Sequence, residues 1–266
     1  MTILEPRRWP PSSDADSPPI HDDAVRIDSV TKRFGDGPRS VLALDGVSLH
    51  VRRGEFVCVV GASGCGKSTL LSVIAGLDGP TTGTLEVAGR TALMFQDAAL
   101  LPWRTAQANV ELPMKLRGVG RAARAERALE LLELVRLREF AGKRPHELSG
   151  GMRQRVALAR ALAQDADVLL MDEPFGALDA ITRDILHDEL ERVVAHKALT
   201  VVFVTHNVRE AARLGDRIML LSSRPGRVVA EFPVDVPRPR RIEAPDVAAI
   251  AAQVTVQLRG EVRRHG

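Results

Sequence analysis

The pattern of hydrophobic and polar residues divides the chain into regions of different character. Residues 1–23 are rich in Pro, Ser and Asp without apolar periodicity, so we expect a disordered tail. From Val25 onwards, "VRIDS" and "VSLHV" alternate apolar and polar residues, as half-buried strands do. "EFVCVV" is a continuous apolar run between Gly54 and Gly61, and it predicts a central strand covered on both faces. "TLEVAG" and "TALMF" predict two more strands.

A helical pattern follows Gln96. Within "RAARAERALELLELVRL", apolar residues recur at helix spacing with charges between them: Ala125, Ala128, Leu129, Leu132 and Val135. Strand and helix patterns then alternate, with a buried strand in "DVLLMDEP", a helix near 180–195, and further strands in "TVVFVTH" and "RIMLLS". Because strands that alternate with helices form mainly parallel sheets, we expect an α/β core with a helical insertion.

Composition and charge narrow the class of protein. The chain has 266 residues, of which 45% are hydrophobic and 27% charged, which is ordinary for a soluble globular protein with a sizeable core. Its apolar runs are too short to span a bilayer, and "RRW" near the start lacks the apolar region of a secretory signal. Aromatic residues total only 3% and tyrosine is absent, which disfavours a single-stranded nucleic-acid binder because such proteins stack bases on aromatic rings.

Basic residues gather towards the C-terminus, where they form either a solvated tail or a contact with a membrane or partner. They are Arg238, Arg240, Arg241, Arg263 and Arg264. The two cysteines, Cys58 and Cys65, do not suggest a disulfide framework and fit a reducing cytoplasm. We expect Cys58 to be a core side chain.

"GASGCGKST" at residues 61–69 matches the Walker A pattern of a phosphate-binding loop, between a buried strand and a helix-forming run. Its glycines allow positive φ and close approach, so that backbone N–H groups converge on phosphates. Lys67 supplies a charge for the β- and γ-phosphates, and the Ser68 hydroxyl a ligand for Mg²⁺. The predicted nucleotide-binding residues here are Gly61, Ala62, Ser63, Gly64, Cys65, Gly66, Lys67, Ser68 and Thr69.

Cys65 lies inside this loop, at a helix N-terminus beside Lys67, where a thiol pKa is expected to fall. A redox switch is one interpretation of Cys65, and a small residue that fits the loop is the other.

Two further positions carry candidate catalytic groups. The strand in "DVLLMDEP" ends at Asp172, predicted to bind the metal, and Glu173, predicted to orient and polarise the attacking water. His206 ends the strand "TVVFVTH", at the sheet edge where ligands bind in open α/β sheets, and is a candidate γ-phosphate contact. An acidic strand terminus that meets solvent and a structural histidine are the alternatives.

"LSGGMRQR" at residues 148–155 adds a second phosphate cradle, with a serine and two glycines opening a predicted helix. Walker A, Gln96 in "MFQD", "LSGGMRQR", Walker B with Glu173, "ALD" at 177–179 and His206 follow one another in an order that resembles ABC-transporter ATPase subunits. The resemblance runs from about Val25 to about Pro239.

This resemblance implies a P-loop NTPase core with a mainly parallel sheet, an antiparallel β subdomain and a helical signature subdomain. We expect the ATPase domain at 24–240, its helical subdomain at about 97–163, and a C-terminal extension at 241–266. It also implies that the signature contacts ATP held by a second copy of the chain, in a head-to-tail dimer.

Several residue roles follow from the resemblance alone. Ser149, Gly150 and Gly151 are the implied contacts to the partner's ATP, and Asp179 lies at the implied dimer seam. Gln96 is implied to join Mg²⁺ and the attacking water to the helical subdomain. Phe34 stands where the family commonly stacks a tyrosine on adenine, so stacking is retained without the hydroxyl.

The implied cofactors are ATP and Mg²⁺, and the implied location is peripheral, on the cytoplasmic face of the cell membrane. Permease subunits are the implied membrane partner, a substrate-binding protein an indirect one, and nucleic acid is not expected. The segment containing Leu100, Leu101 and Trp103 is either the permease-facing surface or part of the subdomain core. A soluble ABC ATPase that acts on ribosomes or nucleic acid is the alternative, whereas a GTPase is disfavoured because no Asn-Lys-x-Asp motif is present.

Three stretches resemble the nitrate/sulfonate/taurine group of importer ATPases. They are "FQDAALLPWRT", "DEPFGALDAITR" and "SSRPGRVVAEFPVDVPRPRR". The ending "VDVPRPRR" is most similar to the aliphatic-sulfonate branch, with taurine and nitrate as close alternatives.

Overall fold

The computed structural model describes residues 23–176 and 178–265, which divide into two compact units. The first unit contains the described residues up to 89 together with 200–265, and the second contains 90–199 apart from residue 177. The predicted tail therefore lies outside the described residues, except for Asp23, where the first strand begins.

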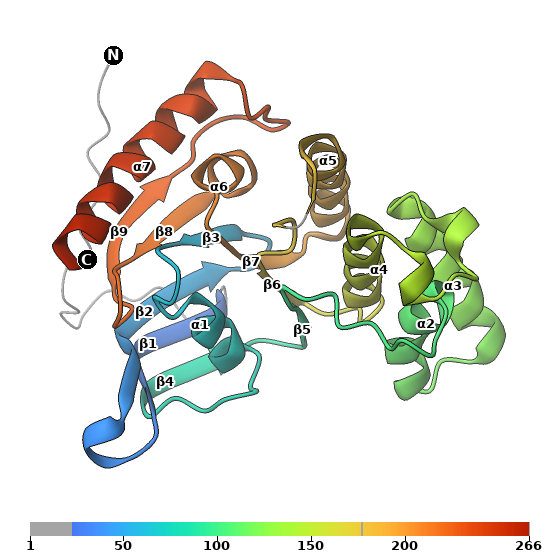
Figure 1. The fold of residues 1–266 in the computed structure, drawn as a ribbon, viewed down its shortest axis with the longest axis horizontal. Coiled ribbons are helices and arrows are strands. Elements are labelled where there is room, and N and C mark those ends of the chain that lie inside the picture. Colours follow the sequence, from blue (N-terminus) through green and yellow to red (C-terminus); the bar gives the residue numbers. More distant parts are fainter. Residues whose placement is uncertain (1–22, 177, 266) are drawn as a thin grey trace. The chain divides into compact units, whose positions relative to one another are not determined.

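An antiparallel sheet of three strands lies in the first unit, in the order β2–β1–β4 (Figure 1). Its strands are β1 (Asp23–Phe34), β2 (Val41–Arg52) and β4 (Thr82–Val87). Ile27 of β1 pairs with Leu49 of β2 and with Leu85 of β4, and its side chain is buried. The alternation seen in the sequence is thus the alternation of a sheet with one buried face.

The first unit also contains strands in the order β7–β3–β8–β9, three of them parallel. They are β7 (Thr200–Thr205), β3 (Phe56–Val60), β8 (Arg217–Leu221) and the antiparallel β9 (Val228–Pro233). Every residue of β3 is buried, as the continuous apolar run predicted. The helices of this unit are α1 (Lys67–Ile74), α6 (Val208–Leu214), α7 (Pro245–His265) and a 3₁₀ turn at Gly37–Arg39.

The second unit pairs β5 (Thr91–Met94) in parallel with β6 (Val168–Asp172). Its helices are α2 (Ala106–Leu116), α3 (Arg121–Leu134), α4 (Gly150–Leu162), α5 (Ala180–Lys197) and two 3₁₀ turns at Arg138–Phe140 and Pro145–Glu147. The α/β class, the antiparallel β subdomain and the helical region are therefore confirmed. Helices α2 to α4 lie within the predicted helical subdomain, about 97–163.

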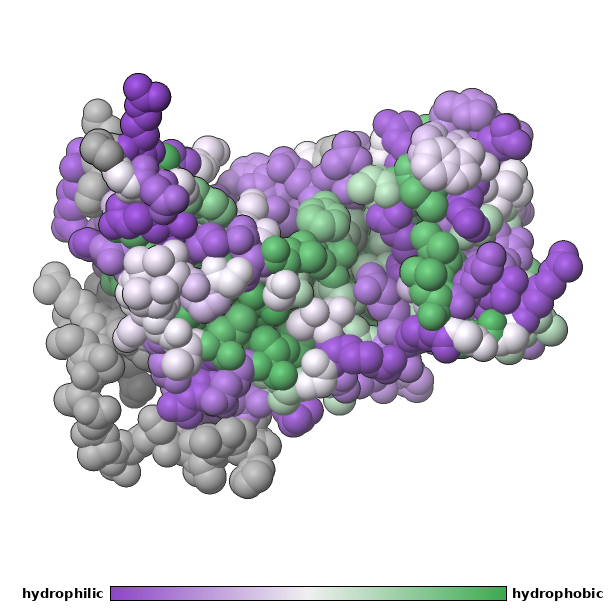
Figure 2. Space-filling view, turned by 90° about the horizontal axis from the view of Figure 1, so that it is seen from below, coloured by the Kyte–Doolittle hydropathy of each residue, from purple (hydrophilic) through white to green (hydrophobic). Residues whose placement is uncertain are grey.

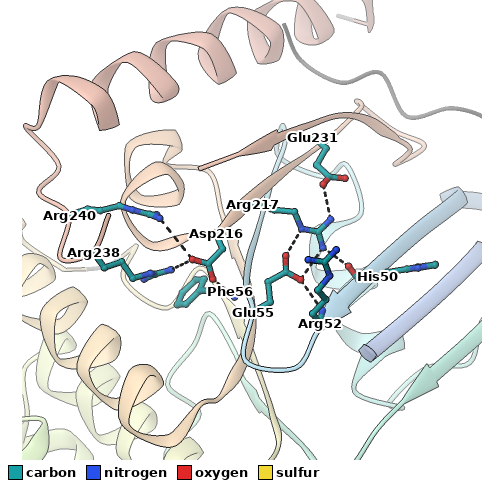
Figure 3. A network of polar contacts seen from close by, with 9 residues as sticks. All are labelled: His50, Arg52, Glu55, Phe56, Asp216, Arg217, Glu231, Arg238 and Arg240. Carbon is teal, nitrogen blue, oxygen red and sulfur yellow. Dashed lines mark hydrogen bonds and ion pairs between the residues drawn. The ribbon is translucent and has the colours of Figure 1, made fainter. Parts of the chain in front are cut away.

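For the C-terminal basic residues, the interpretation as a solvated tail is wrong at Arg238 and Arg240, which bind the folded unit (Figure 3), whereas Arg241, Arg263 and Arg264 are exposed. Arg238 donates to Asp216 Oδ1 at 2.7 Å, while Asp216 Oδ2 accepts the backbone N–H of Phe56 at 2.9 Å. Arg240 is only 5% exposed and donates to the carbonyl oxygens of Gly215 at 2.5 Å and Val234 at 2.9 Å. The segment before α7 thus anchors the start of β3, which leads to the phosphate loop.

A third arginine, Arg217, ties the strands β2, β8 and β9 of the same unit together (Figure 3). Arg217 on β8 donates to Glu55 Oε1 at 2.5 Å, to Glu231 Oε1 at 2.7 Å and to the His50 carbonyl oxygen at 2.5 Å. Burial lowers the pKa of Arg217, but hydrogen bonds and charge interactions with the two glutamates outweigh burial and raise it. This half-buried ion-pair network links β8 to β2, to β9 and to Glu55, the residue directly before β3.

In the view of Figure 2, hydrophobic residues of the described part lie in groups among hydrophilic ones. Among the helices of the described residues, none combines the length and apolar character that crossing a bilayer requires.

Candidate active site

The phosphate loop follows β3 directly and ends at the N-terminus of α1. Gly64 has φ of 75° and Gly66 has φ of 104°, conformations that side chains with a Cβ rarely adopt. A Cβ on Gly66 would also lie 2.7 Å from the carbonyl oxygen of Ala43. Glycine is therefore required at this position by both backbone conformation and space.

Lys67 begins α1 and folds back over the loop. Its side chain is buried, and its Nζ donates to the carbonyl oxygens of Gly61 at 2.9 Å and Ala62 at 3.0 Å. Ser63, Gly64 and Ser68 are exposed. Because the first N–H groups of a helix lack intrahelical partners, the start of α1 offers donors to an anion, and the structure fits a phosphate here.

A turn between β8 and β9 holds the loop from outside, and sequence reasoning missed it. Arg224 Nε donates to the Gly64 carbonyl oxygen at 3.1 Å. Gly226 packs so closely that a Cβ on it would lie 2.3 Å from the Cys65 carbonyl oxygen. The backbone of Gly226 also exchanges hydrogen bonds with β2, at 2.9 Å to both Ala43 and Asp45. "SSRPGR" reads as a turn, but no local pattern says which loop it contacts.

The prediction that the pKa of the Cys65 thiol is lowered is wrong. Burial raises the pKa of the Cys65 thiol and outweighs the opposing effect of the nearby Lys67 ammonium. The side chain is 1% exposed, so the thiol behaves as a small buried residue of the loop rather than as an activated thiolate. Cys58 is fully buried in the core, as expected.

His206 lies at the same sheet edge as the phosphate loop. Strands β3 and β7 are parallel, and Val60 pairs with Thr205, so Gly61 and His206 each follow a paired residue. The turn into α6 is fixed by Asn207, whose side chain accepts the N–H groups of Arg209 at 3.1 Å and Glu210 at 3.3 Å. His206 itself is exposed.

Phe34, at the end of β1, is 41% exposed. The ammonium of Lys32 lies 4.9 Å from the centroid of its ring, a cation–π contact that supports the ring. An exposed, supported aromatic ring is suited to stacking on a flat ligand.

In the second unit, Asp172 ends β6 and Gln96 follows β5, whose last residue, Met94, pairs with Met171. The Gln96 carbonyl oxygen accepts a hydrogen bond at 2.5 Å from Gln154 Nε2 on α4. These positions place Gln96 and Asp172 at the same edge of the pair of strands.

Arg160, also on α4, donates to the carbonyl oxygens of Ala98 and Ala99, both at 2.7 Å. Together with Gln154 it links the segment after Gln96 to the helix that carries the signature sequence. Sequence reasoning missed both residues, because side-chain bonds to a loop backbone leave no periodic signal.

The signature sequence opens α4 as predicted. Ser149 is the N-cap, and its hydroxyl accepts the Met152 N–H at 3.2 Å. Ser149 and Gly150 are exposed, while Gly151 is half-buried, and a Cβ on it would lie 3.0 Å from Leu178 Cδ2. The helix start is thus open on the side of its first residues.

The segment after Asp172 is held by α5. Glu173 has φ of 44°, which is uncommon for a residue with a side chain. Arg183 donates to the carbonyl oxygens of Phe175 at 3.3 Å and Leu178 at 2.7 Å. Asp179 caps α5 by accepting the Thr182 N–H at 2.9 Å, and hydrogen bonding from Thr182 lowers the pKa of its carboxyl. Residue 177, the first of "ALD", lies outside the described residues.

Comparison with known proteins agrees with this arrangement. A family model described as ABC transporter matches residues 44–176. The aliphatic sulfonates import ATP-binding protein SsuB 1 of Agrobacterium fabrum is 48% identical over 239 residues, covering 89% of this chain and 84% of the relative. The chain belongs to the ABC transporter family.

The taurine import ATP-binding protein TauB of Rhizobium johnstonii is also 48% identical, over 87% of this chain and 90% of that protein. A solved structure, the dimeric post-hydrolysis state of the ATP-binding cassette MJ0796 bound to ADP and Pi, matches with a TM-score of 0.74. It is 35% identical, over 80% of this chain and all of its own. The chain is thus an ABC transporter ATPase subunit of the sulfonate, taurine and nitrate import group.

Trp103 lies in the segment between Gln96 and α2, and it is 69% exposed. Leu100 and Leu101 are half-buried. The segment is tied to α2 by the buried Asn109, whose Oδ1 accepts the Leu101 N–H at 2.8 Å. The interpretation that Trp103 is a core side chain is therefore wrong, because its ring lies outside a well-anchored turn.

Proposed function

We propose that the chain is the peripheral subunit, on the cytoplasmic face of the membrane, that hydrolyses ATP to drive import of aliphatic sulfonates. The observation that carries this proposal is a complete phosphate loop, in which Lys67 donates to the carbonyl oxygens of Gly61 and Ala62. The chain that contains this loop is 48% identical to an aliphatic sulfonates import protein. Taurine and nitrate, which are named in the descriptions of two other relatives, are the alternative cargoes.

The phosphate loop and Phe34 bind the nucleotide. The N–H groups at the start of α1 receive phosphate oxygens, and Lys67 exchanges its carbonyl partners for the β- and γ-phosphates. Phe34 stacks its exposed ring on adenine.

The proposed Mg²⁺ ligands are the side-chain oxygen atoms of Ser68, Asp172 and Gln96, because Mg²⁺ prefers hard oxygen ligands; when bound, it would neutralise phosphate charge. The Asp172 carboxylate is half-buried at a strand end, and the Ser68 hydroxyl is exposed. Gln96 is held through its own backbone carbonyl by Gln154, so its side chain remains available as a ligand.

Hydrolysis requires a group that orients water and a group that contacts the terminal phosphate. Glu173, at its unusual backbone conformation, presents a carboxylate that accepts a hydrogen bond from the attacking water and receives its proton. His206 contacts the γ-phosphate from the edge of the sheet at which the phosphate loop lies.

A second copy of the chain completes each site. Ser149, Gly150 and Gly151 form a second cradle at a helix start, and we assign it to the ATP of the partner copy. Asp179 takes the adjoining position at the dimer seam. The dimeric cassette bound to ADP and Pi, at 35% identity, supports this assembly.

Permease subunits are the proposed membrane partner, with the substrate-binding protein linked only through them. The exposed Trp103 supports this, since aromatic residues are enriched in the buried centres of protein interfaces. Nucleic acid is not a proposed partner. Recovery of ribosomes instead of a permease with the tagged chain would favour the soluble ATPase alternative.

Growth of a deletion strain tests the cargo. We expect the strain to fail with alkanesulfonates as the sole sulfur source and to recover with the wild-type chain, but not with Glu173→Gln. Taurine as sulfur source and nitrate as nitrogen source serve as parallel conditions. Normal growth on alkanesulfonates together with failure on nitrate would contradict the sulfonate assignment and leave the ATPase assignment intact.

A further inference from the structure

A pocket of about 760 Å³ lies between α6 and α7, and His206 is the one residue of its lining that the proposed reaction uses. Its lining includes Arg209 of α6, Arg259 and Arg263 of α7, and His206. A volume of this size lies in the range of small-molecule sites. The pocket belongs to the first unit alone.

The pocket lining carries three arginine side chains, all of them exposed. Over residues 23–176 and 178–265, Arg209, Arg259 and Arg263 form no ion pair with a carboxylate. The acidic residues of the two helices nearest to them are engaged elsewhere: Glu210 accepts the Thr205 hydroxyl at 2.5 Å, and Glu261 pairs with Arg264 at 2.9 Å.

The spacing of the arginines favours an anion beside them. Arg259 and Arg263 are four residues apart on α7, where like charges are neighbours on one helix face and destabilise the helix. Arg209 adds a third guanidinium to the same pocket from another helix. Guanidinium groups bind planar or tetrahedral oxyanions through paired hydrogen bonds, so an oxyanion would relieve the repulsion.

The rest of the lining combines two polar residues, Asn207 and Thr255, with three apolar ones. Val208 of α6 and Leu258 and Val262 of α7 share the pocket with the arginines. An inorganic anion would leave these side chains in contact with water, whereas an anion with a hydrocarbon body would cover them.

From this combination we propose that the pocket binds a small organic oxyanion, with its charged group on the arginines and its apolar body on Val208, Leu258 and Val262. Since His206 also lines the pocket, the occupant contacts the residue assigned to the γ-phosphate. The proposal concerns binding, and it does not depend on the identity of the transported cargo.

Calorimetric titration of the full chain with 1-hexanesulfonate tests the proposal. Saturating ADP with Mg²⁺ is present, so that the phosphate loop does not compete for the probe. We expect saturable binding, weakened about tenfold or more by Arg259→Gln combined with Arg263→Gln, which removes charge-assisted hydrogen bonds. Arg264→Gln is the matched control, because it removes one α7 charge that pairs with Glu261 and does not line the pocket.

Inorganic sulfate and phosphate form separate arms. We expect each to bind at least about tenfold more weakly than 1-hexanesulfonate, because burial of only two of its methylenes, at about 0.8 kcal/mol each, already corresponds to about tenfold in affinity. Absence of saturable binding, equal binding by the double variant, or equal affinity for inorganic sulfate would each overturn the proposal. ADP is titrated first, in the absence of sulfonate, and this titration tests nucleotide binding by the phosphate loop. Failure of the proposed nucleotide site can therefore be distinguished from failure of the proposed oxyanion pocket.

Discussion

Substitution of Gly226 by alanine tests whether the turn between β8 and β9 shapes the phosphate loop. The added Cβ would lie 2.3 Å from the Cys65 carbonyl oxygen, 3.3 Å from Leu44 Cδ2 and 3.4 Å from the Ala43 carbonyl oxygen. The closest of these atoms is loop backbone, which cannot rotate away as a flexible side chain can.

Either the turn or the loop must therefore move by about 1 Å to reach ordinary van der Waals distance. Such overpacking costs about 1–3 kcal/mol of the free energy of unfolding. Displacement of one loop N–H from a phosphate oxygen removes a hydrogen bond to a charged group, and we expect the dissociation constant for ADP to rise about 10- to 100-fold.

The assay is an equilibrium titration with fluorescent ADP, with thermal unfolding measured on the same samples. Gly260→Ala is the matched control, because its Cβ would meet nothing within 4 Å and Gly260 lies in α7, where alanine is favoured. Wild-type affinity in Gly226→Ala, with the melting temperature unchanged, would refute the argument that this turn constrains the loop.

The remaining predictions concern single side chains. Glu173→Gln should bind ATP normally while turnover falls about 10²- to 10⁴-fold, measured as phosphate release, because the amide is a poor proton acceptor. Cys65 should react with iodoacetamide at pH 8 far more slowly than a free thiol, since burial raises its pKa and less thiolate is present at that pH. Trp103→Ala should reduce co-purification of the permease without changing the melting temperature, because the ring is exposed, whereas Leu116→Ala, also exposed at 79%, should leave both unchanged.

A different result in each of these three experiments would contradict the corresponding residue assignment. Near-normal turnover in Glu173→Gln would remove that residue from its assigned role. Rapid alkylation of Cys65, confirmed by peptide mapping, would show that the loop thiol is accessible and ionised. Equal permease recovery with both tryptophan and leucine variants would exclude the Trp103 surface as the docking site.

Sequence patterns predicted the local elements well because the signal for each lies within a few residues. The all-apolar run of β3 and the glycines after it specify a buried strand and a phosphate loop directly. The N-cap Ser149 likewise identifies the start of α4 from its own side chain.

Long-range contacts could not be read in the same way. Nothing local in "SSRPGR" indicates that Gly226 packs on Cys65, and nothing in the basic C-terminal segment indicates that Arg240 is buried among carbonyl oxygens. The wrong prediction for the pKa of the Cys65 thiol has a similar cause. The helix start and Lys67 are visible in the sequence, but the degree of burial of the thiol is not.

The central claim is that each ATP is hydrolysed between two copies of the chain, and subunit mixing tests it most directly. Lys67→Ala disables the phosphate loop, whereas Ser149→Asp keeps an N-cap residue but places negative charge where the partner's γ-phosphate is expected. Ser149→Asn, a neutral N-cap, is the control and should retain activity.

Each of the two disabled variants should be inactive alone. Their mixture should recover part of the wild-type ATPase rate, because a hybrid dimer joins the intact phosphate loop of one chain to the intact signature of the other. Absence of recovery on mixing, with hybrid dimers demonstrated, or a wild-type rate from strictly monomeric protein would contradict the claim.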